Sequence, residues 1–356
     1  MSINKAEMKK KNILNRSFFE LTGCIHIHSE FSFDSSKSVK KIIQLAKKQE
    51  LDYITINDHL NLDAKKEESV LSEKDLFVIV GMEVNDKQNN NHYLVFNSDK
   101  ILRGKDAKEY VAYYAQNNAI CFAAHPIEKR VSSKFRTYVW TDLANDDFDG
   151  LEIWNYLSEW IGKMNPKLNG LFLVLFPSLF IRKPHQQILE WWDKMNREGK
   201  RKAAIGSIDA HSEKMEKFGF KFTFLTHRQL FKTIRTNVLL EENKPITQQS
   251  ILTALKDGNS YIVNYKMGNP FGFYAGISDA LGNSAIFGED IKFIKGLKYY
   301  FKLPIIAKVT LFRDGKKISS QRDEKGYFPI KKKGNYRLEI THRGYGWIYS
   351  NNIYVI

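Results

Sequence analysis

Between residues 17 and 265 the chain alternates short, apolar, β-branched runs with segments of helical length. Runs of this kind predict strands at 24–28, 53–57, 77–84, 93–96, 119–124, 151–154 and 204–207. Ser38 can cap a helix up to about residue 50, where apolar residues recur at helical spacing, and further helices are expected at 107–116 and 186–198. So many strands separated by helices predict an α/β fold, with a parallel barrel rather than an open sheet.

From about residue 268 the pattern changes to alternation with a period of two. Such runs lie at 307–312, 336–340 and 348–356, and the pairs Asp314-Gly315 and Lys333-Gly334 are typical of turns. This region predicts a small antiparallel β-sandwich. We therefore expect a basic N-terminal tail at 1–16, a barrel at 17–265 and a β-sandwich domain at 268–356.

The charge of the chain is concentrated at its two ends. The 356 residues carry a formal charge of +15, of which 1–16 holds +4 and 291–356 holds +11, so 17–290 is formally neutral. An enzyme acting on nucleic acid more often has a basic stripe along its working cleft, so nucleic acid is a less favoured partner. The basic ends are expected to be solvated surface, with an anionic surface partner as the alternative.

Cysteine content and apolar run length bear on where the protein works. Cys24 and Cys121 cannot form a disulfide framework and suggest a reducing compartment, so we expect a cytoplasmic protein. The longest apolar run, residues 171–181, is shorter than the ~20 residues of a membrane span. We expect this run to pack as core or as a loop flanking the site; a lipid-touching segment or substrate lid is the alternative. The oligomeric state is left open.

Six of the nine histidines, together with three carboxylates, stand at or just beyond the ends of predicted strands. They are His26, His28, Asp34, His59, Glu83, His92, His125, Asp209 and His211. In a parallel barrel the C-terminal ends of the strands open on one face, so these side chains are expected to converge. Imidazole and carboxylate ligands without cysteine suit Zn, Mn or Fe. The competing interpretation, histidines buried in the core, requires six imidazoles to reach strand ends by coincidence.

Five short motifs in this region resemble those of the polymerase and histidinol phosphatase (PHP) family of metal-dependent phosphoesterases. They are HIHS at 26–29, INDH at 56–59, GME at 81–83, AHP at 124–126 and IDAH at 208–211, in the family's order. The resemblance implies a distorted seven-stranded (β/α) barrel that holds two or three divalent transition metals. It also implies a metal-dependent hydrolase that acts on a small anionic, phosphorylated substrate.

The resemblance carries ligand roles onto matching positions of this chain. It implies a first metal held by His26, His28, Glu83 and Asp209; a second held by Glu83, His92 and His125; and a third held by Asp34, His59 and His211. In the family's chemistry the metals lower the pKa of a bound water, which attacks phosphorus. Asp209 or His211 is then expected to transfer a proton to the leaving group, and Arg130 to clamp the phosphate, with a surface role for Arg130 as the alternative. Asp58 is expected to orient His59 rather than to bind metal.

Segments beyond the barrel resemble a branch of PHP proteins with an appended β-sandwich. They are ALKDGNSYI at 254–262, GF at 272–273 and WIYSNNIYVI at 347–356. One group in that branch, the carbaryl-hydrolase-like proteins, cleaves a carbamate or an ester, and a shared fold does not fix the reaction. Hydrolysis of a carboxyl ester or carbamate is therefore the main alternative to phosphoester hydrolysis. A non-catalytic PHP binding module is less favoured, because no ligand position is empty.

Overall fold

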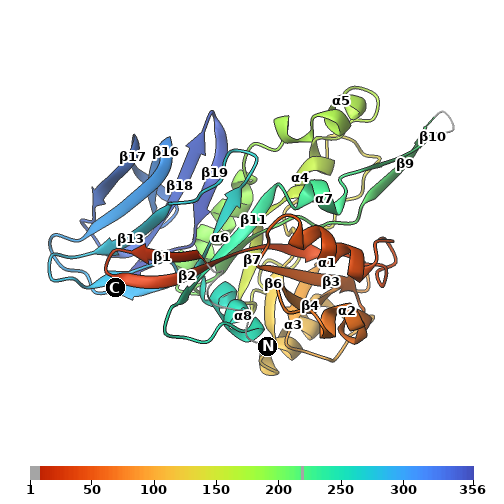
Figure 1. The fold of residues 1–356 in the computed structure, drawn as a ribbon, viewed down its shortest axis with the longest axis horizontal. Coiled ribbons are helices and arrows are strands. Elements are labelled where there is room, and N and C mark those ends of the chain that lie inside the picture. Colours follow the sequence, from red (N-terminus) through yellow and green to blue (C-terminus); the bar gives the residue numbers. More distant parts are fainter. Residues whose placement is uncertain (1–8, 218–219) are drawn as a thin grey trace.

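The structure, a computed structural model, describes residues 9–217 and 220–356 as a mixed α/β fold built on one large sheet (Figure 1). The strands of its first half are β1 (Lys9–Ile13), β2 (Arg16–Ile27), β3 (Tyr53–His59), β4 (Phe77–Val84), β5 (Tyr93–Phe96), β6 (Ile120–Ala123), β7 (Gly150–Asn155) and β8 (Ala203–Ser207). The helices are α1 (Val39–Lys47), α2 (Glu68–Leu71), α3 (Ala107–Gln116), α4 (Tyr156–Lys163), α5 (Gly170–Leu175), α6 (Gln186–Arg197), α7 (His227–Leu230) and α8 (Gln248–Asp257), with short 3-10 turns at Asp63–Lys66 and Pro177–Leu179.

The remaining strands follow or interrupt these helices. They are the hairpin β9 (Glu213–Lys217) and β10 (Phe220–Phe224), then β11 (Ile234–Glu241), β12 (Ser260–Asn264), β13 (Tyr274–Ser278), β14 (Ser284–Ala285), β15 (Asp290–Ile291), β16 (Lys298–Arg313), β17 (Lys316–Pro329), β18 (Gly334–His342), β19 (Tyr345–Ser350) and β20 (Ile353–Val355).

Strands β2 to β8 pair in chain order, but not all of them run parallel. β3 is parallel to β2 and to β4, whereas β5 is antiparallel to both β4 and β6. β6, β7 and β8 are again parallel to one another. The prediction of an all-parallel sheet is therefore wrong at β5, because the eight-residue connection at 85–92 is too short for the crossover that parallel neighbours need.

The sheet does not close into a regular barrel. β8 lies near β2, but the two are joined only beyond the end of β8, by an isolated bridge between Ile27 and Ala210. Backbone hydrogen bonds from His28 N to Ala210 O (3.0 Å) and from Ala210 N to His26 O (3.2 Å) accompany this bridge. The expected seven-stranded barrel is thus replaced by an open arrangement whose last contact is made by the segment after β8.

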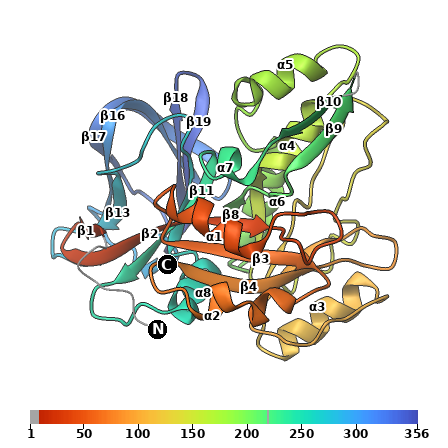
Figure 2. The ribbon, with the colours of Figure 1, turned by 45° about the vertical axis from the view of Figure 1, so that its right-hand side comes forward.

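The C-terminal strands continue the same sheet, so the predicted separate β-sandwich is not confirmed. β2 pairs with β11, β11 with β12 and β12 with β19, and through these strands the sheet reaches β18, β16 and β17. In Figures 1 and 2 the strands β16 to β19 stand at one side of the molecule and β3 and β4 at the other. The Asp314-Gly315 turn does join β16 to β17, with both residues at positive φ.

Buried polar contacts hold this C-terminal part against the first half. Arg337 of β18 is 2% exposed and donates to both carboxylate oxygens of Asp193 on α6, at 2.8 and 2.7 Å. The Asn351 side chain pairs with the backbone of Ala204 in β8, at 2.7 and 2.9 Å. Separating the two halves would break this buried charge pair, and breaking such a pair is strongly destabilising. We therefore expect the two halves to unfold together.

Helices cover the two faces of the β2–β8 sheet, as the sequence pattern requires. The apolar residues of α1, α3 and α6 pack in one core cluster, whereas those of α8 pack in another with the opposite face of the strands. The predicted Ser38 cap is confirmed, since its hydroxyl accepts from Lys41 N at 3.4 Å. The face at the C-terminal strand ends is left to loops, which carry the site residues.

The structure bears on two predicted segments, the basic N-terminal tail at 1–16 and the apolar run at 171–181. Of the predicted basic tail, residues 1–8 lie outside the described residues, and Lys9–Ile13 forms β1, which pairs with β2 instead of being a tail. In the run at 171–181, Leu173 and Ile181 are buried but most other apolar side chains are exposed. Among the described helices, none has the length and apolar character to cross a bilayer.

Candidate metal centre

The carboxylate of Glu83, at the C-terminal end of β4, is the centre of the histidine cluster. It is 1% exposed and lies against five imidazoles. Its Oε2 is 3.0 Å from His26 Nε2, 3.3 Å from His28 Nε2 and 3.4 Å from His59 Nδ1, and its Oε1 is 2.7 Å from His92 Nδ1 and 3.3 Å from His125 Nε2. One carboxylate therefore touches every predicted histidine of the site except His211.

The strand directions explain why these residues meet. His28, His59, Glu83 and His125 follow or end strands whose C-terminal ends share one edge of the sheet. His92 precedes its strand instead, and β5 is antiparallel, so the start of β5 lies at the same edge. The reversal of β5 thus brings His92 to Glu83.

The segment after β8 adds Asp209 and His211 from a distant part of the chain. The hydrogen bonds between 208–210 and β2 place Asp209 Oδ1 3.4 Å from both His26 Nε2 and His28 Nε2. His211 Nε2 lies 3.1 Å from Asp34 Oδ2, which is also 3.1 Å from His59 Nε2. All nine residues predicted as ligands are therefore linked to one another by nitrogen–oxygen distances of 3.5 Å or less.

Hydrogen bonds at Nδ1 point the free lone pairs of two histidines into the cluster. The Ser32 hydroxyl donates to Asp34 Oδ1 at 2.7 Å, so it accepts from His28 Nδ1 at 3.2 Å. His26 Nδ1 donates to Glu152 Oε1 at 2.8 Å. In the neutral rings both Nε2 atoms then carry lone pairs that face carboxylate oxygens, and His28 Nε2 has no hydrogen-bond partner. A cation between these acceptors would satisfy them, which is the arrangement of a metal ligand.

The spacing of the donor atoms also fits metal ions. Two ligand atoms each about 2.1 Å from one ion, at angles of about 90–110°, lie about 3.0–3.4 Å apart. In three groups the candidate ligand atoms all lie within 4.8 Å of one another: His26, His28 and Asp209; His28, Asp34, His59 and His211; and His59, Glu83 and His92. The first group is the ligand set implied for the first metal, without Glu83. The second group is the set implied for the third metal, with His28 added. The last group is the set implied for the second metal, with His59 in place of His125.

Buried carboxylates dominate the electrostatics of the cluster. Burial opposes charge on His26, yet the carboxylates of Asp209, Glu83 and Glu152 raise its pKa well above the usual range. Burial likewise opposes ionisation of Glu83, but His59, His26 and His92 hold its pKa well below normal. Burial lowers the pKa of His92, whereas hydrogen bonding to Glu83 raises that of His125 to about 9 despite its burial. Without metal, protons on some imidazoles supply the positive charge that the carboxylates require.

Three of the predicted ligands have left-handed backbone. His26, His125 and Asp209 have φ values of 67°, 28° and 51°, a region that costs a non-glycine residue about 1–2 kcal/mol. Outliers of this kind cluster at functional sites, where the surrounding structure enforces them. His26 and His125 reach Glu83 from this backbone conformation, and Asp209 reaches His26 and His28.

Sequence reasoning missed Glu152, which supports the cluster from β7. Its side chain is fully buried, and its two oxygens accept from His26 Nδ1, His125 N and Asn155 Nδ2, each at 2.8 Å. Asn155 also donates to Asp209 Oδ2 at 3.2 Å. The sequence did hold a signal for this residue: Glu152 is a carboxylate within the apolar stretch LEIW at 151–154, and a buried charge needs partners.

Arg130 and Asp58 take positions that differ from the expectations for them. The Arg130 guanidinium lies 2.7 Å from Glu128 Oε2 and donates to Arg136 O and Ser158 O, so all three of its nitrogens are engaged. Asp58 accepts from Ser29 N and Ser29 Oγ, at 2.5 and 2.6 Å, instead of orienting His59. Both residues brace loops of the site: Arg130 lines the cavity with its guanidinium already engaged, and Asp58 does not line it.

A cavity of about 300 Å³ opens onto the cluster. Seven of the nine predicted ligands line it, while His26 and His28 lie beneath them. One wall is apolar or aromatic and consists of Phe33, Tyr138, Leu157 and Ile161. The Phe33 ring is 83% exposed and stacks on His59 with centroids 4.9 Å apart. The cavity therefore combines a charged floor with an apolar side.

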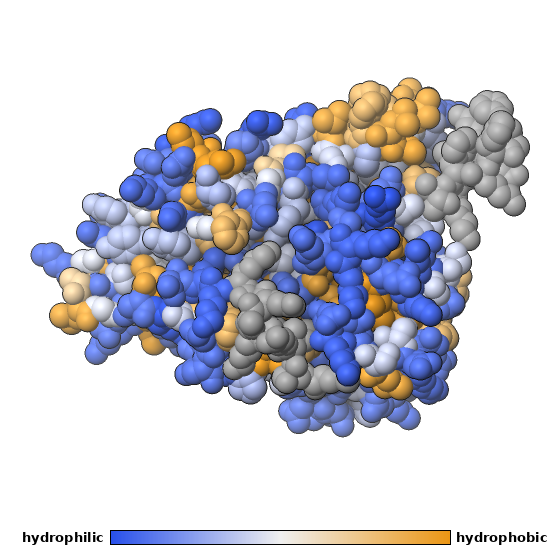
Figure 3. Space-filling view, viewed as in Figure 1, coloured by the Kyte–Doolittle hydropathy of each residue, from blue (hydrophilic) through white to orange (hydrophobic). Residues whose placement is uncertain are grey.

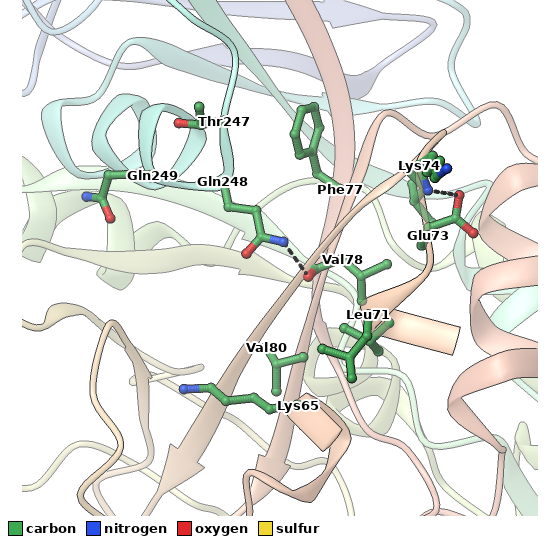
Figure 4. Close-up of a pocket in the computed structure, with 12 residues that line it drawn as sticks. Lys65, Leu71, Glu73, Lys74, Phe77, Val78, Val80, Thr247, Gln248 and Gln249 are labelled. Carbon is green, nitrogen blue, oxygen red and sulfur yellow. Dashed lines mark hydrogen bonds between the residues drawn. The ribbon is translucent and has the colours of Figure 1, made fainter. Parts of the chain in front are cut away.

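Another hollow, of about 520 Å³, lies between β4, α2 and the start of α8 (Figure 4). Val78, Val80 and Leu71 line it, and Gln248 Nε2 donates to Val78 O at 3.1 Å. It contains none of the clustered histidines, so we place the candidate site at the smaller cavity.

Comparison with known proteins supports the family resemblance. The PHP domain family model matches residues 25–125, which include every implied ligand except Asp209 and His211. No curated protein matches the chain.

Two solved structures have low similarity to the chain. One, from Bacteroides vulgatus ATCC 8482, is described as a two-domain protein containing a predicted PHP-like metal-dependent phosphoesterase; it has 14% identity, a TM-score of 0.49 and 99% coverage of both chains. The other, a proposed metal-dependent phosphoesterase from Bifidobacterium adolescentis ATCC 15703, has 13% identity and a TM-score of 0.35, and covers 65% of this chain and 95% of its own. These scores are too low to carry an argument, so the resemblance rests on the family match and the motifs: residues 25–125 of the chain match the PHP domain family.

Proposed function

We propose that the protein is a metal-dependent hydrolase and that a phosphoester is its preferred substrate. The observation that carries this proposal is the contact of the single carboxylate of Glu83 with five imidazoles, at the floor of a cavity. Such a carboxylate can serve neighbouring ions at once. When bound, two or three divalent ions supply an activated water and neutralise charge on the substrate. Zn, Mn and Fe suit the donor set, which has no cysteine.

The residues around the ions have separate roles in this proposal. His26, His28, Asp34, His59, Glu83, His92, His125, Asp209 and His211 hold the metals. Glu152 fixes the ring of His26 and the backbone of His125, so that both keep their orientation. Asp209 or His211 transfers the proton to the leaving oxygen, because both line the cavity. Arg130 acts by holding Glu128 rather than by clamping a phosphate.

The net charge of the site, and therefore the charge of the substrate that it favours, depends on the number of bound ions. Asp34, Glu83, Glu128, Glu152 and Asp209 lie in or against the cluster, and Arg130 offsets one of their charges. With neutral histidines the formal charge is −4, so two divalent ions leave the centre neutral and three make it +2. A dianionic phosphate is favoured only by the three-ion form.

Hydrolysis of a neutral carboxyl ester or carbamate is the second candidate. It is favoured by the apolar wall of Phe33, Leu157 and Ile161, and by the engagement of Arg130, the one Lys or Arg that lines the described cavity. A non-catalytic binding module has less support, because each implied ligand position holds a side chain that can bind metal. We retain 17–265 as the catalytic unit, 268–356 as an accessory unit and a cytoplasmic location, the last because both cysteines are free and buried.

Metal analysis followed by a substrate panel tests the proposal. The protein, loaded separately with Zn, Mn and Fe, is assayed with p-nitrophenyl phosphate, bis-p-nitrophenyl phosphate, p-nitrophenyl acetate and a p-nitrophenyl carbamate. We expect the highest kcat/KM with a phosphoester, in the form with three ions, and competitive inhibition by inorganic phosphate. Faster turnover of the neutral esters without phosphate inhibition would replace the first candidate with the second.

A further inference from the structure

A compact apolar surface, here called the α5 patch, covers α5 and the turn after it. It consists of Leu168, Leu171, Phe172, Leu175, Phe176 and Leu179, which are 48–85% exposed. These six lie within twelve residues, whereas the eleven other large apolar side chains exposed among the described residues are spread over the rest of the chain. In Figure 3 apolar side chains gather over the place that α5 occupies in Figure 1. A patch of this kind is typical of an interaction surface.

The α5 patch is held in place by contacts on its inner side. Leu173 is fully buried, and its carbonyl accepts from Trp160 Nε1 of α4 at 3.2 Å. Ile181, which follows the patch, is 1% exposed. Asn169 Nδ2 donates to Lys163 O at 2.9 Å, which ties the start of α5 to the end of α4. The segment is therefore anchored by the side chains of Leu173 and Ile181, and the six side chains of the α5 patch point outward.

Basic residues flank the α5 patch on both sides along the sequence. Residues 160–189 contain no Asp or Glu, but contain Lys163, Lys167, Arg182 and Lys183. None of these four cations has a carboxylate within 4.0 Å among the side chains that the structure describes. The nearest acid along the chain, Glu159, is half-buried; burial raises its pKa, and Lys163 opposes that rise. The segment around the patch thus carries four cations, with Glu159 as the nearest acid.

A cavity of about 750 Å³ joins this charge to the apolar residues. Phe172, Leu179 and Phe180 line it together with Lys163, Arg182 and Lys183, and Glu159 is the one acidic residue of its lining. His185 lies in the same cavity, and its pKa is lowered by burial and then by Lys129 and Lys163, against an opposing effect of Glu190. The cavity offers cations and apolar surface to the same ligand, as an anionic amphiphile requires.

We propose that the α5 patch and its basic cavity form a docking site for a bilayer that contains anionic phospholipids. Leu and Phe side chains would enter the boundary between headgroups and acyl chains, while the four cations would contact lipid phosphates. Helix α4 links this surface to the candidate metal centre, because Leu157 and Ile161 line the metal cavity and Lys163 lines the basic one. Docking would therefore place the metal cavity beside the membrane surface.

Charge argues against a second copy of the chain as the occupant. Two α5 patches facing each other would bring eight cations together with no acidic residue from 160–189 to pair with them. Desolvating unpaired like charges is unfavourable, whereas an anionic bilayer supplies the missing counter-charges.

Vesicle co-sedimentation tests the proposal on the full-length protein, and this readout is independent of catalysis. Vesicles of phosphatidylcholine alone are compared with vesicles that also contain about 30% phosphatidylglycerol, at low and high salt. We expect binding to the anionic vesicles, weakened by salt, and a loss of about tenfold or more in Leu171→Ser/Leu175→Ser. The matched control, Phe271→Ser/Leu281→Ser, removes two side chains that are 67% and 82% exposed on another part of the surface, and should bind like wild type.

Charge variants and a fluorescent label complete the test. Lys167→Gln/Lys183→Gln should lower binding to anionic vesicles by about tenfold, and Lys331→Gln/Lys333→Gln, with the same change in net charge, by less. Leu171→Cys can be labelled selectively with an environment-sensitive dye, because Cys24 and Cys121 are buried. The label should shift to the blue on anionic vesicles, whereas the same label at Leu281→Cys should not.

Three results would overturn the proposal. They are absence of wild-type binding to anionic vesicles, equal binding by Leu171→Ser/Leu175→Ser, and a wild-type dimer that this variant converts to monomer without any effect of vesicles. The last result would identify a second copy as the occupant. Thermal unfolding of each variant, compared with wild type, distinguishes these outcomes from loss of the fold.

Discussion

The substitution Glu152→Gln tests the role of a buried carboxylate that binds no metal in our proposal. Three donors converge on its two oxygens: His26 Nδ1, His125 N and Asn155 Nδ2, each at 2.8 Å. Glutamine has nearly the same shape but only one acceptor oxygen. At least one of these donors would then face an NH₂ group and remain unpaired in a buried position.

The size of the effect follows from that count. One buried donor left unsatisfied costs about 1–3 kcal/mol, which corresponds to about 5–150-fold in an equilibrium constant. If His26 loses its partner, its ring loses both its fixed tautomer and its orientation, so the cost falls on metal affinity. We expect metal affinity to fall by about 10–100-fold, as is typical when a carboxylate behind a metal-bound histidine is lost.

Competition with a chelator of known affinity measures this change. The control is Glu20→Gln. Glu20 is another buried carboxylate, which pairs with Lys11 at 2.7 Å and is hydrogen-bonded to Tyr261; it lies near the start of β2, whereas His26 lies near its end. Both variants should lower the temperature of unfolding, but only Glu152→Gln should weaken metal binding. Unchanged metal affinity in Glu152→Gln, or an equal loss in Glu20→Gln, would refute the reasoning.

Three further predictions follow from the site and the charge distribution. Glu83→Ala should reduce bound metal more than His59→Ala, since Glu83 contacts five imidazoles; equal metal content in wild type and Glu83→Ala by elemental analysis would contradict its bridging role. The pKa of His125 is raised to about 9, so its protonation stabilises the metal-free fold below about pH 6.5, and this contribution is lost as the pH rises to 9; the unfolding temperature should fall over that range without metal, and fall less with metal bound. Neutralising the lysines at 331–333 should leave turnover of a small substrate unchanged, and a large fall in kcat would show that the C-terminal strands reach the active site.

Local features of the fold were predictable from sequence, whereas long-range pairing was not. Strands at 77–84 and 93–96 and the helix at 107–116 have the predicted bounds, because apolar periodicity and caps act within a few residues. The continuation of the sheet through β12 and β19 depends on residues nearly ninety positions apart, such as Val263 and Ile348. Nothing in either strand alone indicates its partner, so an alternating pattern was interpreted as a separate sandwich.

The sequence predicted which residues cluster at the candidate site, but not all the contacts that support them. The rule that strand ends share one face brought nine residues together correctly, because it depends on topology alone. It could not show that Arg130 is engaged by Glu128, since that contact depends on the conformation of the loop after His125. Nor could it find Glu152, which precedes the end of its strand and supports the ligands from behind.

The backbone at His26 departs from the alternation of a regular strand. Strict alternation along β2 places Cys24, His26 and His28 on one face, yet the pairing of β2 with β3 shifts between Cys24 and Ile27, and His26 has φ 67°. The Cys24 sulfur lies in the core, 3.9 Å from Ile234 O, while His26 and His28 both reach Glu83. The turn at His26 therefore separates the site from the core below it. Without metal, the strained backbone at His26 lowers the stability of the folded protein. Metal binding by His26 and the other ligands would offset this cost, so we expect metal binding and folding to be coupled in this protein.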